Sequence, residues 1–209
     1  MARLSVTAFV SLDGVVQAPG SPEEDQDGGF TQGGWAMPLF DDQAVAHMAA
    51  VFDEATAFLL GRRTYEIFAA HWPRVTDPGD PIATRLNTLP KYVASSAPAE
   101  LGWAGAATLT GDVPGEVARL KGELDGELQI HGSGVLAQSL MEHGLVDVYR
   151  ILTFPVILGR GKRLFTHGAA PGALRLTSSV ATGTGIVMSR YEATGRPPES
   201  GDATSETRG

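Results

Sequence analysis

Residues 127–140 read ELQIHGSGVLAQSL, and they mark a change from one type of secondary structure to another. A short apolar run ends at the small residues His131-Gly132-Ser133-Gly134, and a helical pattern of apolar residues begins directly after them. A strand that turns into a helix in this way directs unpaired backbone N–H groups and the positive end of a helix dipole at one point. Because Gly132 and Gly134 lack side chains, an anion such as a pyrophosphate can approach the backbone closely. The stretch therefore predicts a strand–helix junction suited to binding phosphate.

The glycine spacing of this junction has more than one interpretation. Together with Ala137 it reads G-x-G-x-x-A, which is also the fingerprint of dinucleotide-binding Rossmann folds. In a chain with 26 glycines, close packing of a helix on a strand explains the same spacing equally well. A Rossmann dehydrogenase carries the fingerprint near its N-terminus, with an acidic residue about 20 residues further on. The position of these glycines at 132–134 argues against that fold.

A second junction of the same kind lies earlier in the chain. Ala57–Leu60 is typical of a short buried strand, and it ends at Gly61-Arg62-Arg63-Thr64, which opens another helical pattern. Arginine can bind phosphate through two parallel hydrogen bonds, so the two arginines strengthen the prediction of a phosphate site. A third strand, Lys91–Ser95, ends in Ser95-Ser96, whose hydroxyls could hold a phosphate or could simply form a turn.

The segment after the first strand contains the candidates for the substrate side. The strand Leu4–Val10 leads into Ser11-Leu12-Asp13-Gly14. Asp13 is either a turn residue that bonds its own backbone or a functional carboxylate at the strand end, where α/β proteins place ligands. The loop Gln17–Gly34 has no periodicity and exceeds the length of a simple connection, which is typical of a lid. Trp35 closes this loop, either as an anchor on a ring-shaped ligand or as its hydrophobic pin.

The other periodic segments predict helices and strands that alternate along the chain. A helix capped by Asp41 or Asp42 runs to about Asp53, with Val45, Met48, Ala49 and Phe52 on its inward face. Residues 159–163, GRGKR, match a Walker A loop only in part, because Arg163 stands where Ser or Thr is required. We interpret them as a basic turn. Further helices are expected at Ile82–Leu89 and Val113–Leu124, and further strands at Ala107–Leu109, Leu145–Phe154, Leu174–Thr182 and Gly185–Ala193, the last two forming a hairpin.

Composition excludes several classes of protein. No apolar run approaches the roughly 20 residues of a membrane span, and the N-terminus lacks the apolar core of a signal peptide, so we expect a cytoplasmic protein. The chain has no cysteine, which excludes disulfides, thiolate nucleophiles and thiolate-bound metals, and no metal is expected. A net charge of −8 argues against general binding to nucleic acid or anionic membranes, so any phosphate site must be local.

Taken in order, these landmarks resemble the dihydrofolate reductase-like superfamily, in the branch of the C-terminal reductase domain of the bifunctional riboflavin-biosynthesis deaminase/reductase. Gly61-Arg62-Arg63-Thr64 matches the G-R-x-T motif that holds the NADPH phosphates in that family. Ser95-Ser96 matches the hydroxyls beside the adenosine 2′-phosphate, and Gly132-Ser133-Gly134 matches the Gly-Gly element that receives the pyrophosphate. Residues 11–14, SLDG, and 155–162, PVILGRGK, point to the riboflavin-type branch. The resemblance covers about residues 3–194.

The resemblance implies an α/β fold, a three-layer sandwich in which helices flank a mixed, mostly parallel, twisted sheet with a C-terminal antiparallel hairpin. It also implies a homodimer that transfers a hydride from NADPH to a small heterocyclic substrate, pterin-like or flavin-precursor-like, as 5-amino-6-(5-phosphoribosylamino)uracil reductase does. In it Arg62 would neutralise the 2′-phosphate, Asp13 would orient the substrate or relay a proton, and Trp35 would close the site. The residues expected to contact NADPH are Gly61, Arg62, Arg63, Thr64, Ser95, Ser96, His131, Gly132, Ser133, Gly134, Val135 and Leu136.

The chain also departs from the family's patterns. Folate reductases bind the pterin with an acidic residue inside the first helix, whereas the inward positions expected here are apolar, so we expect a substrate other than folate. The sequence contains no zinc deaminase domain fused to the reductase-like part, so we expect a protein other than the bifunctional riboflavin enzyme. We expect one reductase domain, residues 1–194, and a disordered polar tail, residues 195–209. The alternative function is a non-catalytic sensor or scaffold that keeps the dinucleotide cleft.

Overall fold

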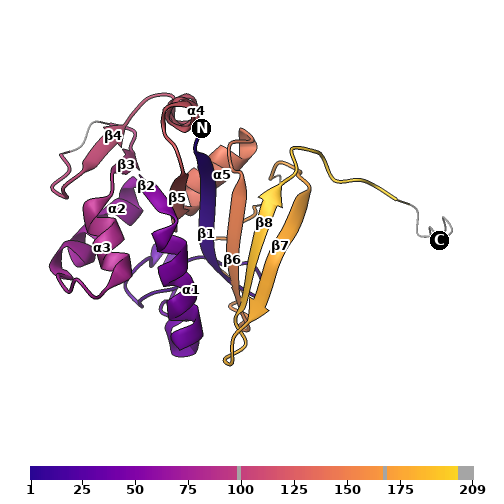
Figure 1. Ribbon diagram of the computed structural model, residues 1–209. Coiled ribbons are helices and arrows are strands. Elements are labelled where there is room, and N and C mark those ends of the chain that lie inside the picture. The colour runs from indigo at the N-terminus through magenta and orange to yellow at the C-terminus, as the bar shows by residue number, and fades with distance from the viewer. Residues whose placement is uncertain (98–99, 167–168, 202–209) are drawn as a thin grey trace.

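An eight-stranded sheet organises the chain in the computed structural model, which describes residues 1–97, 100–166 and 169–201 (Figure 1). The strands are β1 (Arg3–Ser11), β2 (Ala55–Gly61), β3 (Lys91–Ala94), β4 (Ala106–Leu109), β5 (Glu127–His131), β6 (Val148–Phe154), β7 (Leu174–Ala181) and β8 (Val187–Ala193). The α-helices are α1 (Asp42–Asp53), α2 (Arg62–His71), α3 (Pro81–Thr88), α4 (Val113–Glu123) and α5 (Gly134–Glu142). Three 3-10 helices complete the set: η1 (Asp27–Gly29), η2 (Met37–Leu39) and η3 (Trp72–Arg74).

The strand order is β4-β3-β2-β5-β1-β6-β8-β7, and it separates a parallel part from an antiparallel part. The first six strands pair in parallel, because helices or long connections return the chain to the same end of the sheet. Strand β8 runs antiparallel to β6, and the hairpin partner β7 forms the sheet's outer edge. The predicted α/β class, with a mixed sheet and a C-terminal hairpin, is confirmed.

Helices cover both faces of the sheet and create two cores. On one face α1, α2 and α3 pack on the sheet through residues such as Met48, Phe52 and Tyr65, which surround the buried ring of Phe58. On the other face α4 and α5 pack against Leu128 and Ile130 of β5. The two faces of β5 therefore differ, with its apolar residues on the α5 face and Glu127, Gln129 and His131 on the α1 face.

The carboxyl ends of the parallel strands lie along one edge of the sheet. Gly61 at the end of β2 is the register partner of Ala94 at the end of β3, and Phe58 of β2 pairs with Gln129 of β5. Thr7 of β1 pairs with His131, the last residue of β5. The two predicted glycine junctions and the serine pair are consequently neighbours along this edge.

Several expectations about individual residues are wrong. Val45 is 47% exposed, while Ala44 and Val51 take inward positions of α1 together with Met48 and Phe52. The strand predicted from Leu145 begins at Val148, because Leu145 belongs to the end of α5: its N–H donates to the Leu140 carbonyl at 3.0 Å, past Gly144 in the left-handed conformation.

The predicted tail, residues 195–209, lies partly outside the described residues, and its described part, 195–201, contains no helix or strand. Within the described parts of the chain, none of the helices has both the length and the apolar character needed to cross a bilayer.

Candidate cofactor site

The two glycine junctions are in direct contact. The N–H of Gly61 donates to the Ser133 hydroxyl oxygen at 3.0 Å, and the N–H of Ser133 donates to the Thr64 hydroxyl oxygen at 3.2 Å. Ser133 adopts the left-handed conformation, with φ 52°, which turns the chain sharply from β5 into α5. Two segments about 70 residues apart in sequence thus build one structure, as the phosphate-site prediction requires.

The helices that start at these junctions lack side-chain caps. The other three α-helices each have an aspartate cap, from Asp41, Asp80 and Asp112, that accepts from first-turn N–H groups. No described side chain accepts from the first turn of α2 or α5. The Ser133 hydroxyl accepts from the N–H of Gly61 and makes no cap bond to α5. Two uncapped helix N-termini, with their partial positive charges, therefore meet at one place.

The glycines leave room for a ligand at this place. A Cβ atom added to Gly61 or to Gly132 would lie 3.6 Å from its nearest neighbour, which belongs to Ser133 or to Thr64 respectively. Val135, in the first turn of α5, is 78% exposed, so the helix end opens to solvent, while Leu136 is half-buried behind it. Backbone N–H groups here can approach a phosphate more closely than groups shielded by side chains.

The two arginines have different partners. The Nε of Arg62 bonds a carboxylate oxygen of Glu66 at 2.6 Å on the helix surface. Arg63 pairs instead with Asp25 and Asp27 of the loop after β1. Ser95 continues β3, since its N–H donates to the Leu109 carbonyl, and it lies next to Ala94, the register partner of Gly61. The serine pair and the arginines therefore border the same junction.

His131 is placed differently from its predicted neighbours in the motif. Its imidazole is buried, stacks on the Phe52 ring at 4.2 Å between centroids, and bonds the Gln129 side-chain oxygen at 2.9 Å. Burial, and secondarily the charge of Arg150, lowers the pKa of His131 to about 3, so the ring is neutral. Any contact between His131 and a cofactor would have to come from its backbone.

Asp13 ties two turns together. One carboxylate oxygen accepts from the Ser11 hydroxyl at 2.7 Å and from the N–H of Leu158 at 3.1 Å, and the other accepts from the N–H of Gly159 at 2.8 Å. The Ser11 hydrogen bond and these backbone bonds lower the pKa of Asp13 to about 2. Its catalytic role stays a prediction, and the low pKa favours orienting a group over relaying a proton near neutral pH.

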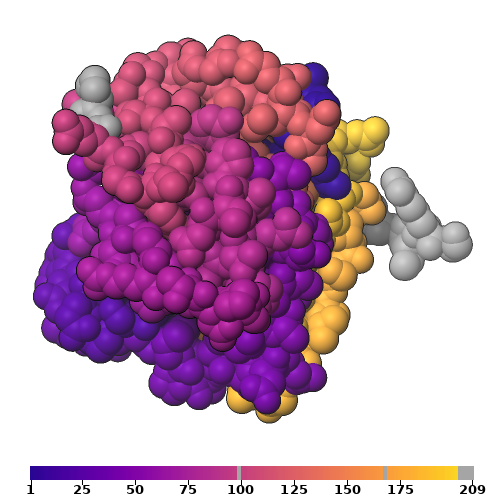
Figure 2. Space-filling model, turned by 60° about the vertical axis from the view of Figure 1, so that its left-hand side comes forward, coloured from indigo at the N-terminus to yellow at the C-terminus, as the bar shows by residue number. Residues whose placement is uncertain are grey.

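Trp35 pins the loop that follows β1, which forms the indigo bulge at the lower left of Figure 2. Its indole N–H donates to the Gln17 carbonyl at 2.8 Å, and its ring meets the Phe154 ring edge-on at 5.3 Å. Trp35 is half-buried, and Phe30 of the same loop is buried against Val15. The pin interpretation of Trp35 describes this geometry, and contact with a ligand stays a prediction.

Sequence reasoning missed the charges that hold this loop. Lys162, in the segment interpreted as a basic turn, binds Asp25 and Asp27 with Nζ–O distances of 2.7 Å each. Arg163, the residue that breaks the Walker A pattern, lies 3.6 Å from an Asp13 carboxylate oxygen. The available signal was the density of acidic residues in a loop that faces two basic motifs.

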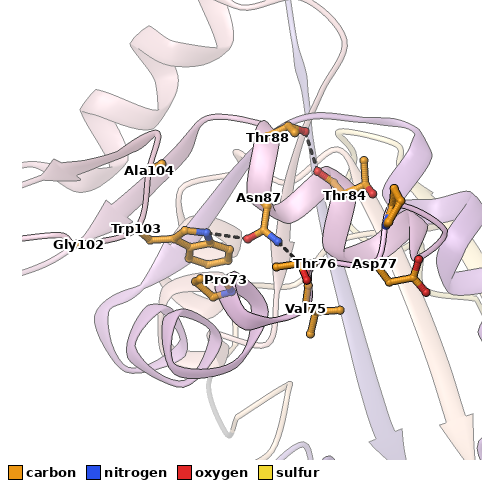
Figure 3. A pocket seen from close by; sticks show the side chains of 11 residues that line it. Pro73, Val75, Thr76, Asp77, Thr84, Asn87, Thr88, Gly102, Trp103 and Ala104 are labelled. Carbon is orange, nitrogen blue, oxygen red and sulfur yellow. Dashed lines mark hydrogen bonds between the residues drawn. The ribbon is translucent and has the colours of Figure 1, made fainter.

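Two surface hollows lie elsewhere and share no residue with this site. The larger, about 540 Å³, is lined by η3, α3 and the turn before β4 (Figure 3). There the Trp103 indole N–H donates to the Asn87 side-chain oxygen at 3.0 Å, and the Asn87 amide donates to the Trp72 carbonyl at 2.9 Å. This hollow is open, and the side chains that form its floor are satisfied by one another.

A mixed α/β sheet flanked by helices, with two contacting glycine junctions at its carboxyl edge, is the dihydrofolate reductase-like fold. The family model of the RibD C-terminal domain matches residues 2–188, and the chain belongs to that family. The resemblance stated from the sequence motifs is thereby confirmed.

Relatives and solved structures agree with this assignment. Over 195 residues the chain is 23% identical to YyaP, an uncharacterized protein of Bacillus subtilis (strain 168). This alignment covers 90% of the chain and 94% of YyaP. A crystal structure of a Shewanella sp. PV-4 protein provisionally named for riboflavin biosynthesis superposes with a TM-score of 0.70 at 21% identity, over 93% of this chain and 99% of the other. Dihydrofolate reductase from Enterococcus faecalis, complexed with NADP(H), superposes with a TM-score of 0.56 at 14% identity. That superposition covers 92% of this chain and 96% of the reductase. At these identities the likeness shows the fold.

Proposed function

We propose that the protein is an NADPH-dependent reductase that transfers a hydride to a small heterocyclic substrate. The observation that carries the proposal is the contact between two uncapped, glycine-containing helix N-termini, joined through Ser133 and Thr64 and bordered by Arg62. Membership of the RibD C-terminal domain family and the fold shared with a reductase complexed with NADP(H) support the same conclusion. When bound, NADPH supplies the hydride, so the protein needs no side-chain nucleophile.

The described residues suggest a role for each part of the site. Backbone N–H groups of Gly132, Gly134, Val135 and Leu136 would bind the pyrophosphate, and Thr64 fixes the position of that turn by accepting from the N–H of Ser133. Arg62, with one i,i+4 ion pair and 44% of its side chain exposed, can exchange Glu66 for the 2′-phosphate. Arg63 and Ser96 would assist. The loop pinned by Trp35 would exclude water from the reacting atoms.

The substrate side favours a ring other than folate. The buried residues of α1 are Ala44, Met48, Val51 and Phe52, so its inward face carries no carboxylate to pair with a pterin. Asp13, with its pKa of about 2, can orient a substrate hydroxyl or amide as a hydrogen-bond acceptor. A flavin-precursor-like heterocycle fits these groups better than folate does.

Titration of NADPH and NADH against wild type and Arg62→Ala tests the cofactor assignment. Hydrogen bonds to charged groups contribute about 1.5–3 kcal/mol, and the exposure of Arg62 places the loss at the low end, roughly tenfold in NADPH affinity with NADH unchanged. Arg74→Ala is the matched control, because this exposed arginine lies in η3, at the other end of α2. If Arg62→Ala binds NADPH and NADH each as tightly as wild type does, Arg62 is not the residue that holds the 2′-phosphate.

The alternative, a dinucleotide sensor without turnover, is favoured by one observation: the buried residues of α1 include no carboxyl, and Asp13, with a pKa of about 2, is ionised near neutral pH. Following NADPH oxidation against pterins, flavin precursors and quinones separates the two functions. Turnover on any of them supports the reductase, and tight binding without turnover on all of them supports the sensor.

We also propose that the protein forms a homodimer through β7. Every residue of this edge strand is exposed, including Leu176 at 53% and Val180 at 57%, and its outer edge has no neighbouring strand among the described residues. Sedimentation velocity should give the mass of two chains, and Leu176→Lys should shift it toward one. A monomeric wild type would contradict this proposal.

A further inference from the structure

The loop after β1 carries two carboxylates that form ion pairs with basic side chains at the edge of the candidate cofactor site. Asp25 lies 3.1 Å from Arg63 and 2.7 Å from the Nζ of Lys162, and Asp27 pairs with the same two cations. Arg63 is the second residue of α2, directly before Thr64, which contacts the pyrophosphate junction. Lys162 belongs to the turn between β6 and β7. Two cations from separate elements are thus neutralised by one acidic loop segment.

The loop is shaped to present these carboxylates together. Gln17 is buried, and its amide nitrogen donates to the Asp25 carbonyl at 3.1 Å and to the Asp27 carbonyl at 3.0 Å. Its amide oxygen accepts from the backbone N–H of Lys162 at 3.0 Å. The N–H of Asp27 donates to the Asp25 carboxylate at 3.1 Å. The arrangement places two negative charges at one end of α2, as a bound phosphate would.

We propose that Asp25 and Asp27 act as an internal substitute for the phosphates of the ligand and thereby set its affinity. This inference rests on the proposed function. A polyphosphate that arrives at the junctions takes Arg63 and Lys162 from the two carboxylates, because three or more phosphate oxygens offer better bidentate partners for a guanidinium. Losing both cations leaves two like charges side by side, which releases the segment around Asp25 and Asp27 from the α2 end. The base of the loop stays pinned, because the Trp35 indole N–H still donates to the Gln17 carbonyl.

The exchange has a measurable cost to binding. The ion pairs are partly exposed, since 51% of the Arg63 side chain and 45% of the Lys162 side chain are accessible, so each contributes modestly. Removing one carboxylate charge should therefore raise affinity for NADPH and for inorganic pyrophosphate about two- to fivefold. The geometry also predicts that saturating wild type with either ligand speeds amide exchange in residues 20–30.

The experiment compares Asp25→Asn, Asp27→Asn and Glu23→Gln in the full chain. In Asp25→Asn the remaining oxygen can still accept from the Gln17 amide and from the Asp27 backbone N–H while the charge is removed. In Asp27→Asn the charge is removed from a side chain whose partners are Arg63 and Lys162. Glu23→Gln is the matched control, because it makes the same charge change in the same loop at an exposed residue without an ion pair to the described cations. Affinities come from calorimetry with NADPH and with pyrophosphate, and loop release from hydrogen exchange.

Tighter binding in both asparagine variants and unchanged binding in Glu23→Gln support the inference. The inference is overturned if the asparagine variants bind NADPH and pyrophosphate equally to wild type or more weakly. It is also overturned if saturation slows amide exchange in residues 20–30. In either case, NADPH binding by wild type leaves the proposed function standing. If wild type binds pyrophosphate with loop release but does not bind NADPH, the proposed function fails and the substitution mechanism stands. Should either asparagine variant fail to fold, Lys162→Gln must speed loop exchange without any ligand.

Discussion

Replacing Arg150 by methionine should destabilise the protein without changing its affinity for a dinucleotide. Arg150 is 2% exposed and pairs with Glu127, itself 8% exposed, and with Glu54. Breaking a buried ion pair from one side costs about 3–5 kcal/mol, because the other charge is left buried. Glu127 would still accept from Ser5 at 2.8 Å and from Gln129 at 2.9 Å, so we expect the low end, about 3 kcal/mol.

Urea unfolding of the variant, with its slope compared with wild type, measures this loss, and a thermal scan should show a drop of roughly 6–12 °C for a chain of this size. Glu54→Gln is the control: Glu54 contacts the same guanidinium, but 56% of its side chain is exposed, so its loss should stay below about 1 kcal/mol. In Arg150→Met/Glu127→Gln the buried charge is gone, and most of the stability should return.

Two results would refute this reasoning. A loss below about 1 kcal/mol for Arg150→Met would mean that Glu127 is solvated or protonated without its partner, and a double variant no better than the single one would mean that packing is responsible. Affinity for NADPH, measured well below the melting temperature, should equal that of wild type. Glu127 begins β5 and the glycine junction follows its end, so about 16 Å of strand separates the two.

Three further changes test other parts of the structure. Asp13 has a pKa near 2, below the usual 3.8, so its contribution to stability is complete above about pH 4 and is lost as the pH falls toward 2. Asp13→Asn should therefore cost at most about 2 kcal/mol of unfolding free energy at pH 7, and in urea titrations its difference from wild type should vanish near pH 2. Full turnover by this variant would mean that Asp13 is a turn residue only. At Gly61 the φ of −69° suits alanine, and an added Cβ would lie 3.6 Å from Ser133. Gly61→Ala should therefore change the unfolding free energy by less than about 1 kcal/mol while the affinity for NADPH falls severalfold. An unchanged affinity would mean that the ligand binds elsewhere. Burial lowers the pKa of Lys91 from 10.5 to about 8, so the unfolded chain binds more protons between these values and wild type should gain roughly 3 kcal/mol relative to Lys91→Met between pH 8 and 10.5. Parallel stability curves would contradict that shift.

The sequence predicted the fold and the two strand–helix junctions because both depend on local patterns. Apolar runs ending at glycines located β2 and β5 and the helices after them, and the order of the motifs identified the family. The contact between Ser133 and Gly61 could not be read from spacing, since it depends on β2 and β5 becoming neighbours in the sheet. Once that pairing exists, parallel register places both junctions at the same edge.

Polar residues were harder to place than apolar ones. Arg150 is charged and yet buried on β6, because Glu127 and Glu54 from other elements supply its counter-charges. His131 was expected among the cofactor contacts, yet its side chain belongs to the layer beneath α1, since alternation along β5 sends it to the same face as Gln129. Period-two alternation predicts the face of a strand residue, whereas a charged partner depends on tertiary structure.

The position of buried charge bears on our expectation that the substrate is a ring other than folate. The resemblance implies that folate reductases bind the pterin with an acidic residue inside the first helix, and the buried residues of α1 include none. The buried carboxylate on this side of the sheet belongs to Glu127, on a strand, and it already accepts from Ser5, Gln129 and Arg150. A protonated ring would have to displace a guanidinium held at 3.1 Å and at a second, shorter contact in a buried site, which costs more than a surface exchange. Glu127 is therefore not free to pair with a protonated ring, and the buried residues of α1 supply no carboxylate in its place.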